Sequence, residues 1–364
     1  MAHALRLAAR ALGRTHPNPT VGCVLTRQGK VVGRGWHHKA GMPHAEVEAM
    51  ASCDPQQVRG STAYVTLEPC SHHGRTPPCC EALIQAGVAR VVVAMLDPNP
   101  LVAGRGIARL QEAGIPVTLG VLEKEAAALV RPFVTWITHK RPMVTLKAAA
   151  SLDGKIATRS GESQWITGPL ARQKVQRLRD THDLVMVGIG TVLADDPQLN
   201  CRLAGGRDPI RLVVDSHLRL PLNARILSSS TTAPLWLATT QAGMEEQFRK
   251  LEHLKGVKLL LCEEDEQGRV NLPHLLQLLA DQGITSILSE AGGRLSSSLL
   301  EHHLVDRLAL FLAPRLIGGQ QAAGILNGAG VASLLQTPYL QSWHSQRLGE
   351  DLFITGDLSY EQKG

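Results

Sequence analysis

The chain has 364 residues, of which 44% are hydrophobic and 19% charged, so it is long enough for two domains and too apolar for large disordered regions. Its net charge of +6 would suit an anionic partner, but aromatic residues make up only 3%, which disfavours a single-stranded nucleic-acid surface. No apolar run would span a membrane and no signal-peptide pattern is present, so we expect a cytoplasmic protein. These properties favour a phosphorylated small molecule as the partner.

Strand and helix patterns alternate along the first part of the chain. Residues 21–35 (VGCVLTRQGKVVGRG) predict a hairpin with a polar turn at residues 27–30. This alternation predicts a mainly parallel sheet with helices packed on its faces. Residues 123–139 predict a further helix, which Pro132 would kink or split. The other expected elements are helices at residues 1–14, 44–50, 78–87 and 104–114, and strands at residues 62–69, 90–96 and 115–121.

A second alternating set follows the polar stretch HKRP at residues 139–142, where we expect the domain boundary. The expected helices are at residues 168–182, 272–283 and 294–303. The expected strands, most of them continuous apolar runs as buried strands require, are at residues 143–151, 183–192, 210–216, 233–240, 257–262, 284–293, 306–314 and 351–358. The sequence therefore predicts two domains of the α/β class, residues 1–140 and 141–364.

The densest cluster of potential metal ligands is the stretch PCSHHGRTPPCC at residues 69–80. In a reducing compartment, clustered cysteines indicate a metal or catalysis before disulfides, and the odd total of seven cysteines agrees. Cys70 follows a predicted strand, while Cys79 and His44 lie where predicted helices begin. One imidazole and two thiolates would bind zinc and leave a fourth position open, as in catalytic zinc sites. A structural zinc, or none, is the alternative.

The other potential metal ligands in this stretch are His72, His73 and Cys80, and the geometry of a catalytic zinc site disfavours each of them. A fourth protein ligand from His72 or His73 would close the site and stop hydrolysis, so we interpret both as loop residues. Successive helix residues point about 100° apart, so Cys79 and Cys80 cannot easily share one metal. Cys80 aligns with an apolar helix face, which predicts a core residue.

Glu46 follows His44 in the sequence HAE. The pattern H-x-E followed by P-C-x-x-C is the signature of zinc nucleobase and nucleotide deaminases. Glu46 would reach the water on the metal rather than the metal itself, take a proton from it and pass that proton to a leaving amine. The second cysteine lies further from the first than this signature requires.

Segments along nearly the whole chain resemble the bifunctional deaminase–reductase family of riboflavin biosynthesis. They are HPNPTVGCV, HAEVEA, LEPCSHHGRTPPCC, DPNPLVAGRGIARL, KAAASLDGKIA, SGESQWITG, GTVLADDP and EAGG. The resemblance implies an α/β protein with an N-terminal cytidine-deaminase-like three-layer α/β/α domain and a C-terminal dihydrofolate-reductase-like α/β domain. It also implies a homodimer.

The resemblance implies two activities in sequence. A zinc-dependent pyrimidine nucleotide deaminase, a hydrolase acting on cyclic amidines, would convert 2,5-diamino-6-(5-phosphoribosylamino)pyrimidin-4(3H)-one to 5-amino-6-(5-phosphoribosylamino)uracil. An NADPH-dependent oxidoreductase would then reduce the ribosyl group to give 5-amino-6-(5-phosphoribitylamino)uracil. The long loop between Cys70 and Cys79 would help to recognise the phosphoribosyl substrate.

The resemblance also assigns site residues. At the deaminase site it implies that His44, Cys70 and Cys79 bind one zinc ion and that Glu46 is the proton donor. For the pyrimidine nucleotide there, it implies contacts from Asn18, Arg75 and Asn99. For NADPH, it implies contacts from Ala149, Trp165, Thr191, Asp195, Ser216, Gly292, Gly293, Arg294, Leu295, Ser296, Ser297 and Ser298. For the reductase substrate, it implies contacts from Ser163, Arg179, Leu199, Arg202 and Glu290.

The chemistry of some residues assigned to the reductase supports their predicted roles independently of the resemblance. The Gly-Gly turn at residues 292–293 lies between a predicted strand and helix, where backbone N–H groups suit a phosphate, although it does not match G-x-G-x-x-G. Arg179 and Arg202 would clamp a phosphate with their guanidinium forks. For the proton donor of the reduction, Lys147 and Asp195 are both candidates.

The sequence disfavours two other classes of protein, a nucleic-acid-editing deaminase and a protein in which zinc only holds the fold. A nucleic-acid-editing deaminase would need an aromatic-rich basic groove, which the composition disfavours. A protein in which zinc only holds the fold would have no use for Glu46 beside a three-ligand set.

Overall fold

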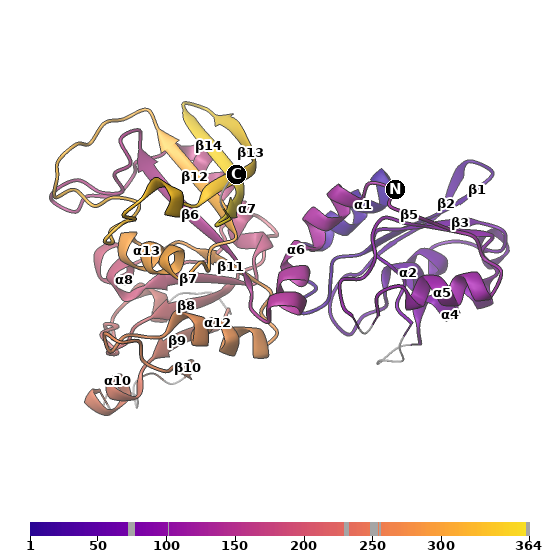
Figure 1. Ribbon diagram of the computed structural model, residues 1–364, viewed down its shortest axis with the longest axis horizontal. Coiled ribbons are helices and arrows are strands. Elements are labelled where there is room, and N and C mark those ends of the chain that lie inside the picture. Colours follow the sequence, from indigo (N-terminus) through magenta and orange to yellow (C-terminus); the bar gives the residue numbers. More distant parts are fainter. Residues whose placement is uncertain (72–76, 101, 229–232, 248–253, 255, 362–364) are drawn as a thin grey trace. The chain divides into compact units, whose positions relative to one another are not determined.

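The structure is a computed structural model that describes residues 1–71, 77–100, 102–228, 233–247, 254 and 256–361 (Figure 1). The chain forms two compact units, Met1–Arg141 and Pro142–Gly364. Among the helices in the described ranges, none is long and apolar enough to cross a membrane.

The first unit contains a five-stranded sheet in the order β2–β1–β3–β4–β5. Its strands are β1 Gly22–Arg27, β2 Lys30–Trp36, β3 Thr62–Val65, β4 Arg90–Val93 and β5 Val117–Leu119. The hairpin is confirmed, but β1 runs antiparallel to both β2 and β3, while the β3–β4 and β4–β5 pairs are parallel. Four of the five strands therefore share one direction, as the predicted mainly parallel sheet requires, and the sheet is mixed only because β1 inserts between β2 and β3.

Helices cover both faces of this sheet. Alternate residues of β1 point to opposite faces, so Cys23 and Leu25 enter the larger core while Val24 packs against the first helix. The unit therefore has three layers, α/β/α. Helix α6 is continuous through Pro132, so of the two predicted effects, a kink or a split, the split does not occur. The helices are α1 Ala2–Ala8 and α6 Glu123–His139 on one face, and α2 Ala45–Ala51, α3 Pro55–Val58, α4 Cys79–Ala86 and α5 Arg105–Glu112 on the other.

The second unit contains a nine-stranded sheet in the order β10–β9–β8–β7–β11–β6–β12–β14–β13. The seven strands from β10 to β12 are parallel, and β14 and β13 extend the sheet antiparallel. The strands are β6 Met143–Ser151, β7 Leu184–Gly188, β8 Ile210–Val214, β9 Leu235–Thr239, β10 Val257–Leu261, β11 Ser286–Ser289, β12 Arg307–Ala313, β13 Tyr339–Leu348 and β14 Asp351–Ser359.

Helices also pack on both faces of the second sheet. On β7, Leu184 and Met186 enter the core that α12 and α13 cover, while Val185 and Val187 enter the core that includes α8. The helices are α7 Pro169–Thr181, α8 Ile189–Asp195, α9 Arg225–Ser228, α10 Gln241–Glu246, α12 Leu272–Asp281 and α13 Gly293–Glu301.

Several elements of this unit differ from the sequence prediction, among them helices α9 and α10, which were not expected. The strand expected at residues 183–192 ends at Gly188, and α8 begins at Ile189. Strand β13 was not expected, because most of its residues are exposed and carry no buried apolar pattern.

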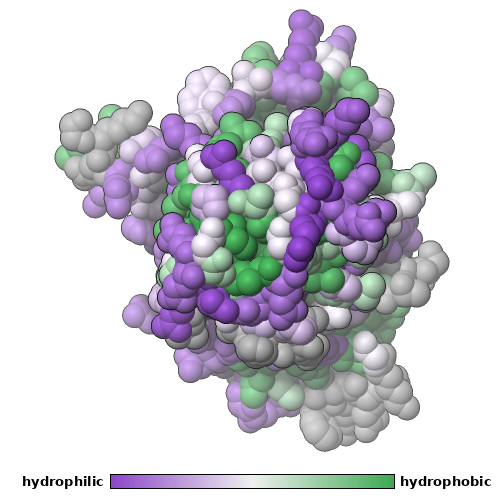
Figure 2. All heavy atoms as spheres, turned by 90° about the vertical axis from the view of Figure 1, so that its right-hand side faces the viewer, coloured by the Kyte–Doolittle hydropathy of each residue, from purple (hydrophilic) through white to green (hydrophobic). Residues whose placement is uncertain are grey.

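Figure 2 shows one face of the molecule, on which hydrophobic side chains gather near the centre and hydrophilic ones surround them.

Candidate active sites

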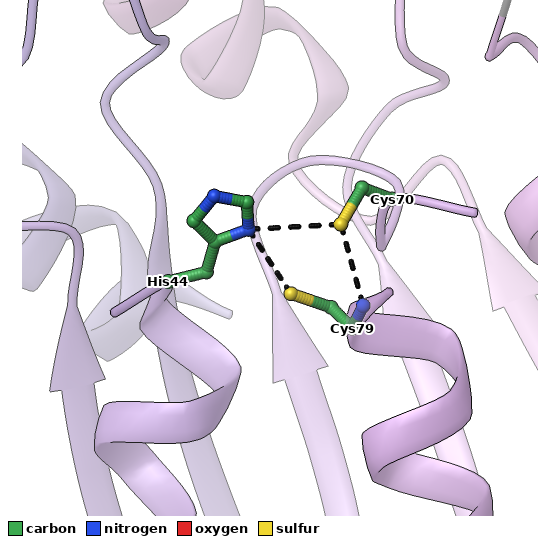
Figure 3. A group of neighbouring side chains, drawn as sticks. All are labelled: His44, Cys70 and Cys79. Atoms are coloured by element: carbon green, nitrogen blue, oxygen red, sulfur yellow. Dashed lines mark hydrogen bonds between the residues drawn. The ribbon is translucent and has the colours of Figure 1, made fainter. Parts of the chain in front are cut away.

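The three candidate zinc ligands of the first unit lie together where two helices begin (Figure 3). His44 is the residue before α2, with φ −75° and ψ 164°, and its side chain makes no capping bond to that helix. Cys70 follows β3, and Cys79 is the first residue of α4. The Nδ1 atom of His44 lies 3.1 Å from Sγ of Cys79 and 3.6 Å from Sγ of Cys70. All three ligand atoms lie within 4.8 Å of one another.

The chemistry of this donor set fits zinc. Two sulfur atoms and one imidazole nitrogen are ligands that zinc prefers, and a three-ligand set leaves a position for water or substrate. Hydrogen bonds from Cys79 and from His44 hold the pKa of Cys70 well below its usual range, although burial opposes this. The same bond to Cys70, together with burial, raises the pKa of Cys79. Cys80 lies outside the set, in the core beside Leu83, and is only 1% exposed.

Glu46 lies in the first turn of α2 beside the two cysteines and is only 3% exposed. Burial raises the pKa of its carboxyl to about 7, and the neighbouring Cys70 adds to this shift. A carboxyl with a pKa near neutrality can both accept and release a proton, which is the property that a general acid–base group requires.

His37 is a site residue that the sequence analysis missed. Its ring lies edge-on to the ring of His44, with centroids 5.4 Å apart. Nδ1 of His37 contacts the carbonyl oxygen of Pro43 at 3.0 Å, so Nδ1 carries the hydrogen and Nε2 accepts a bond from the side-chain amide of Asn18 at 3.1 Å. This bond joins the predicted contact Asn18 to a ring that packs against the candidate zinc ligand His44. Only its position in the stretch WHH, shortly before PHAE, could have drawn attention to His37.

Two predicted contacts of the deaminase site remain, Arg75 and Asn99. Arg75 lies outside the described residues, as do the loop residues His72 and His73. Asn99 lies after β4, and its backbone N–H donates to Oδ1 of Asp97 at 2.8 Å.

The second unit contains a cavity of about 1080 Å³. It opens where the parallel strands β6, β7, β8 and β11 end, which is the usual place for a ligand in a sheet of this type. Its lining includes most of the residues assigned to NADPH and the reductase substrate, namely Ala149, Ser163, Trp165, Arg179, Thr191, Asp195, Leu199, Arg202, Ser216, Glu290, Gly292, Gly293, Arg294, Leu295 and Ser298.

Two members of the predicted NADPH set, Ser296 and Ser297, are not among these lining residues. Both side chains are buried on α13, and the hydroxyl of Ser296 donates to the carbonyl oxygen of Ala291. Their place on the helix explains this, because successive residues of a helix cannot all face one side. The structure therefore leaves Ser298 as the member of this serine run that reaches the cavity.

The cavity lining fits an anionic dinucleotide. The backbone at the start of α13, with Gly292 and Gly293, offers N–H groups of the kind that bind phosphate. Arg202 and Arg294 add positive charge to the lining. Trp165 is 57% exposed and offers an aromatic face for stacking.

Glu290 forms a buried ion pair at the end of β11. Nε and Nη2 of Arg179 donate to its two carboxylate oxygens at 2.6 and 3.0 Å, and Nζ of Lys147 lies 3.5 Å away. Burial alone would raise the pKa of Glu290, but the charges of Arg179 and Lys147 outweigh it and hold that pKa at about 2. Nη1 of Arg179 also donates to the carbonyl oxygen of Asn200. Arg179 therefore orients Glu290, besides facing the cavity.

Two family models match the chain, one in each unit. Residues 1–95 match the cytidine and deoxycytidylate deaminase zinc-binding region, and residues 142–354 match the RibD C-terminal domain. The fold and the two sites therefore define a bifunctional enzyme, a zinc-dependent deaminase joined to an NADPH-dependent reductase.

Relatives match nearly the whole chain. Riboflavin biosynthesis protein RibD of Escherichia coli (strain K12) is 45% identical over 97% of this chain and 97% of its own length. The solved structure of Acinetobacter baumannii RibD, form 1, is 41% identical and has a TM-score of 0.86 over 98% of this chain and 97% of its own. A diaminohydroxyphosphoribosylaminopyrimidine deaminase/5-amino-6-(5-phosphoribosylamino)uracil reductase from Thermotoga maritima is 34% identical, with a TM-score of 0.87 over 99% and 97%. The chain belongs to the RibD family of riboflavin biosynthesis proteins, which confirms the resemblance seen in the sequence.

Proposed function

We propose that residues 1–140 deaminate 2,5-diamino-6-(5-phosphoribosylamino)pyrimidin-4(3H)-one and that residues 141–364 reduce the ribosyl group of the product to a ribityl chain. The observation that carries this proposal is the cluster of His44, Cys70 and Cys79 with the buried Glu46 beside it. The substrate of the Thermotoga maritima relative, as its name gives it, supports the choice of pyrimidine.

In the deaminase, His44, Cys70 and Cys79 would hold a zinc ion, which would activate water for hydrolysis near neutral pH. Glu46 takes a proton from the attacking water on its carboxylate and passes that proton to the leaving amine. Burial raises the pKa of Glu46 in the metal-free cluster, which favours uptake of a proton at this carboxyl. Asn18, which His37 orients, and Asn99 contact the nucleotide. Arg75 is proposed as a third contact on the sequence resemblance alone.

In the reductase, NADPH supplies the hydride. The backbone at Gly292 and Gly293 binds its phosphates, while Arg202 and the Arg179–Glu290 pair hold the substrate. For the proton donor, Lys147 is better supported than Asp195. Lys147 presents an ammonium beside the buried Glu290, whereas Oδ1 of Asp195 accepts a bond from Ser163 at 2.6 Å.

We also propose a homodimer in the cytoplasm. Several large apolar side chains in the C-terminal part of the second unit are exposed, including Leu316 (76%), Leu334 (87%) and Trp343 of β13 (57%). A second copy of the chain would cover them. The seven free cysteines agree with a reducing compartment. Sedimentation of the purified protein should give a dimer, and Trp343→Asp should shift it toward monomer.

A paired assay tests the catalytic proposal. The full chain is given the diaminopyrimidine nucleotide and NADPH, and ammonia release and NADPH oxidation are followed together. Glu46→Gln should retain zinc but lose about 10²- to 10⁴-fold in ammonia release. It should still oxidise NADPH at the wild-type rate when the deaminated intermediate is supplied. No ammonia from the wild type would contradict the first activity, and ammonia without NADPH oxidation would contradict the second.

A further inference from the structure

Glu68 is a buried carboxylate to which none of the roles above applies. It lies two positions before the zinc ligand Cys70 and is only 3% exposed. A charge is expensive to bury unless hydrogen bonds compensate it, so its surroundings require an explanation.

Four backbone N–H groups surround this carboxylate. Oε1 accepts from Gly106 at 2.8 Å and from Ile107 at 3.2 Å, and Oε2 accepts from Gly104 at 2.9 Å and from Asp97 at 3.2 Å. All four donors belong to one segment, residues 97–107, which leads from β4 into α5. Hydrogen bonds of this kind, with an ionised acceptor, are about twice as strong as neutral ones.

The same carboxylate caps α5. Gly106 and Ile107 are in the first turn of that helix, where backbone N–H groups have no partner within the helix. The residue before the helix, Gly104, has no side chain to cap it. Glu68 therefore serves as a cap from outside the helix, and its negative charge also suits the positive end of the helix.

A backbone contact joins the same two segments. A Cβ atom on Gly106 would lie 2.0 Å from the carbonyl oxygen of Pro69, which is closer than any side chain tolerates. The start of α5 therefore lies directly against the residue before Cys70. The segment that carries Asn99 is thus fixed to the strand end that carries a zinc ligand, by a carboxylate and by a direct backbone approach.

We propose that Glu68 is a positioning residue of the deaminase, which fixes the segment 97–107 so that Asn99 meets the pyrimidine nucleotide at the metal. This inference rests on the proposed function, because Asn99 is a proposed substrate contact. The backbone of Asn99 is itself held within the segment, since its N–H donates to Asp97 and its carbonyl oxygen accepts from Val102 and Ala103.

The variant Glu68→Gln tests this role in the full chain. Its amide has the same shape but presents N–H groups to donors, so two of the four bonds lose their acceptor. We expect KM for deamination to rise about 10-fold or more, with a smaller change in kcat. Zinc should stay at one per chain, and NADPH oxidation with supplied intermediate should be unchanged. The matched control is Glu81→Gln, a half-buried carboxylate on α4 that bonds Arg109 of α5, and it should leave KM unchanged.

A double variant separates positioning from general damage. If Glu68 acts through Asn99, Glu68→Gln combined with Asn99→Ala should have the KM of Asn99→Ala alone. Should Glu68→Gln fail to fold, Glu68→Asp, which keeps the charge but cannot span the distance, replaces it in both measurements.

The inference is overturned by an unchanged KM, by loss of zinc as the sole cause of the defect, or by additive effects in the double variant. The proposed function fails separately, if the wild type releases no ammonia or Glu46→Gln retains full deamination. If the wild type and Glu46→Gln behave as proposed but KM of Glu68→Gln is unchanged, only the positioning role of Glu68 is contradicted.

Discussion

Each unit of the molecule has a buried glutamate at its site. The pKa values of these two carboxyls are shifted in opposite directions from the ordinary value of a glutamate. Burial raises the pKa of Glu46 to about 7, whereas Arg179 and Lys147 hold the pKa of Glu290 at about 2 despite its burial. The difference lies in the neighbours, since Glu46 faces cysteines and Glu290 faces two cations. A carboxyl of the first kind exchanges protons near neutral pH, while one of the second kind is a fixed negative charge. The contrast separates proton transfer in the first unit from electrostatic positioning in the second.

Removal of the metal should have the largest effect, because it should abolish the activity of one unit and leave the activity of the other unchanged. A chelator strong enough to strip zinc is expected to abolish ammonia release, because all three ligands lie in the first unit. NADPH oxidation with supplied intermediate should continue, since the cavity is lined by residues of the second unit. Measuring zinc content and both rates on one sample checks this. Parallel loss of both activities would contradict the separation of the sites.

The variant Glu290→Gln should cost the second unit much of its stability. Removing one member of a buried ion pair leaves Arg179 without its partner, which typically costs about 3–5 kcal/mol. Calorimetric unfolding of the full chain measures the loss. The control is Glu266→Gln, at an exposed position, which should change stability by no more than about 0.5 kcal/mol. A Glu290→Gln protein as stable as this control would show that the pair is not a fixed charge.

Acid should lower the free energy of unfolding of the second unit, because it protonates Glu290. The pKa of Glu290 is lower in the folded chain than its ordinary value of 4.5, so its contribution is fully present above pH 4.5. It is lost as the pH falls from 4.5 toward about 2, and its full size is roughly 3 kcal/mol. Unfolding curves at several pH values should show this loss in the wild type, whereas Glu290→Gln should show a shallower slope over the same range.

The smallest effect concerns Cys80, the neighbour of a zinc ligand. Its thiol is 1% exposed and packs in the core of the first unit, so Cys80→Ala should remove about 1 kcal/mol of stability and leave zinc bound. Cys79→Ala should lose the metal instead. Zinc analysis of the two variants would reverse the assignment if Cys80→Ala were the one without metal.

The sequence predicted the metal cluster well, because zinc chemistry restricts the ligands to few residue types and the open coordination position excludes a fourth ligand. It did not reveal His37 or Glu68, whose roles depend on backbone groups that only the folded chain brings near them. The mixed direction of the first sheet was missed for a related reason. Hydrophobic periodicity shows where strands lie in the sequence, but it does not show that β1 lies between β2 and β3 in the sheet. Strand β13 was missed because exposed polar residues carry no pattern of burial.

The helices α2, α4 and α5 all begin at one edge of the first sheet, since the strands that precede them run in one direction. Apart from Cys70, which follows β3, the site draws on the beginnings of these helices: His44 before α2, Cys79 at the start of α4, and the N–H groups of α5 that bond Glu68. Further along each helix, Ala49, Leu83 and Leu110 are buried in the core of the unit rather than at the cluster. A designer could therefore exchange the interior of this unit and keep its chemistry, provided that the helix beginnings remain in register.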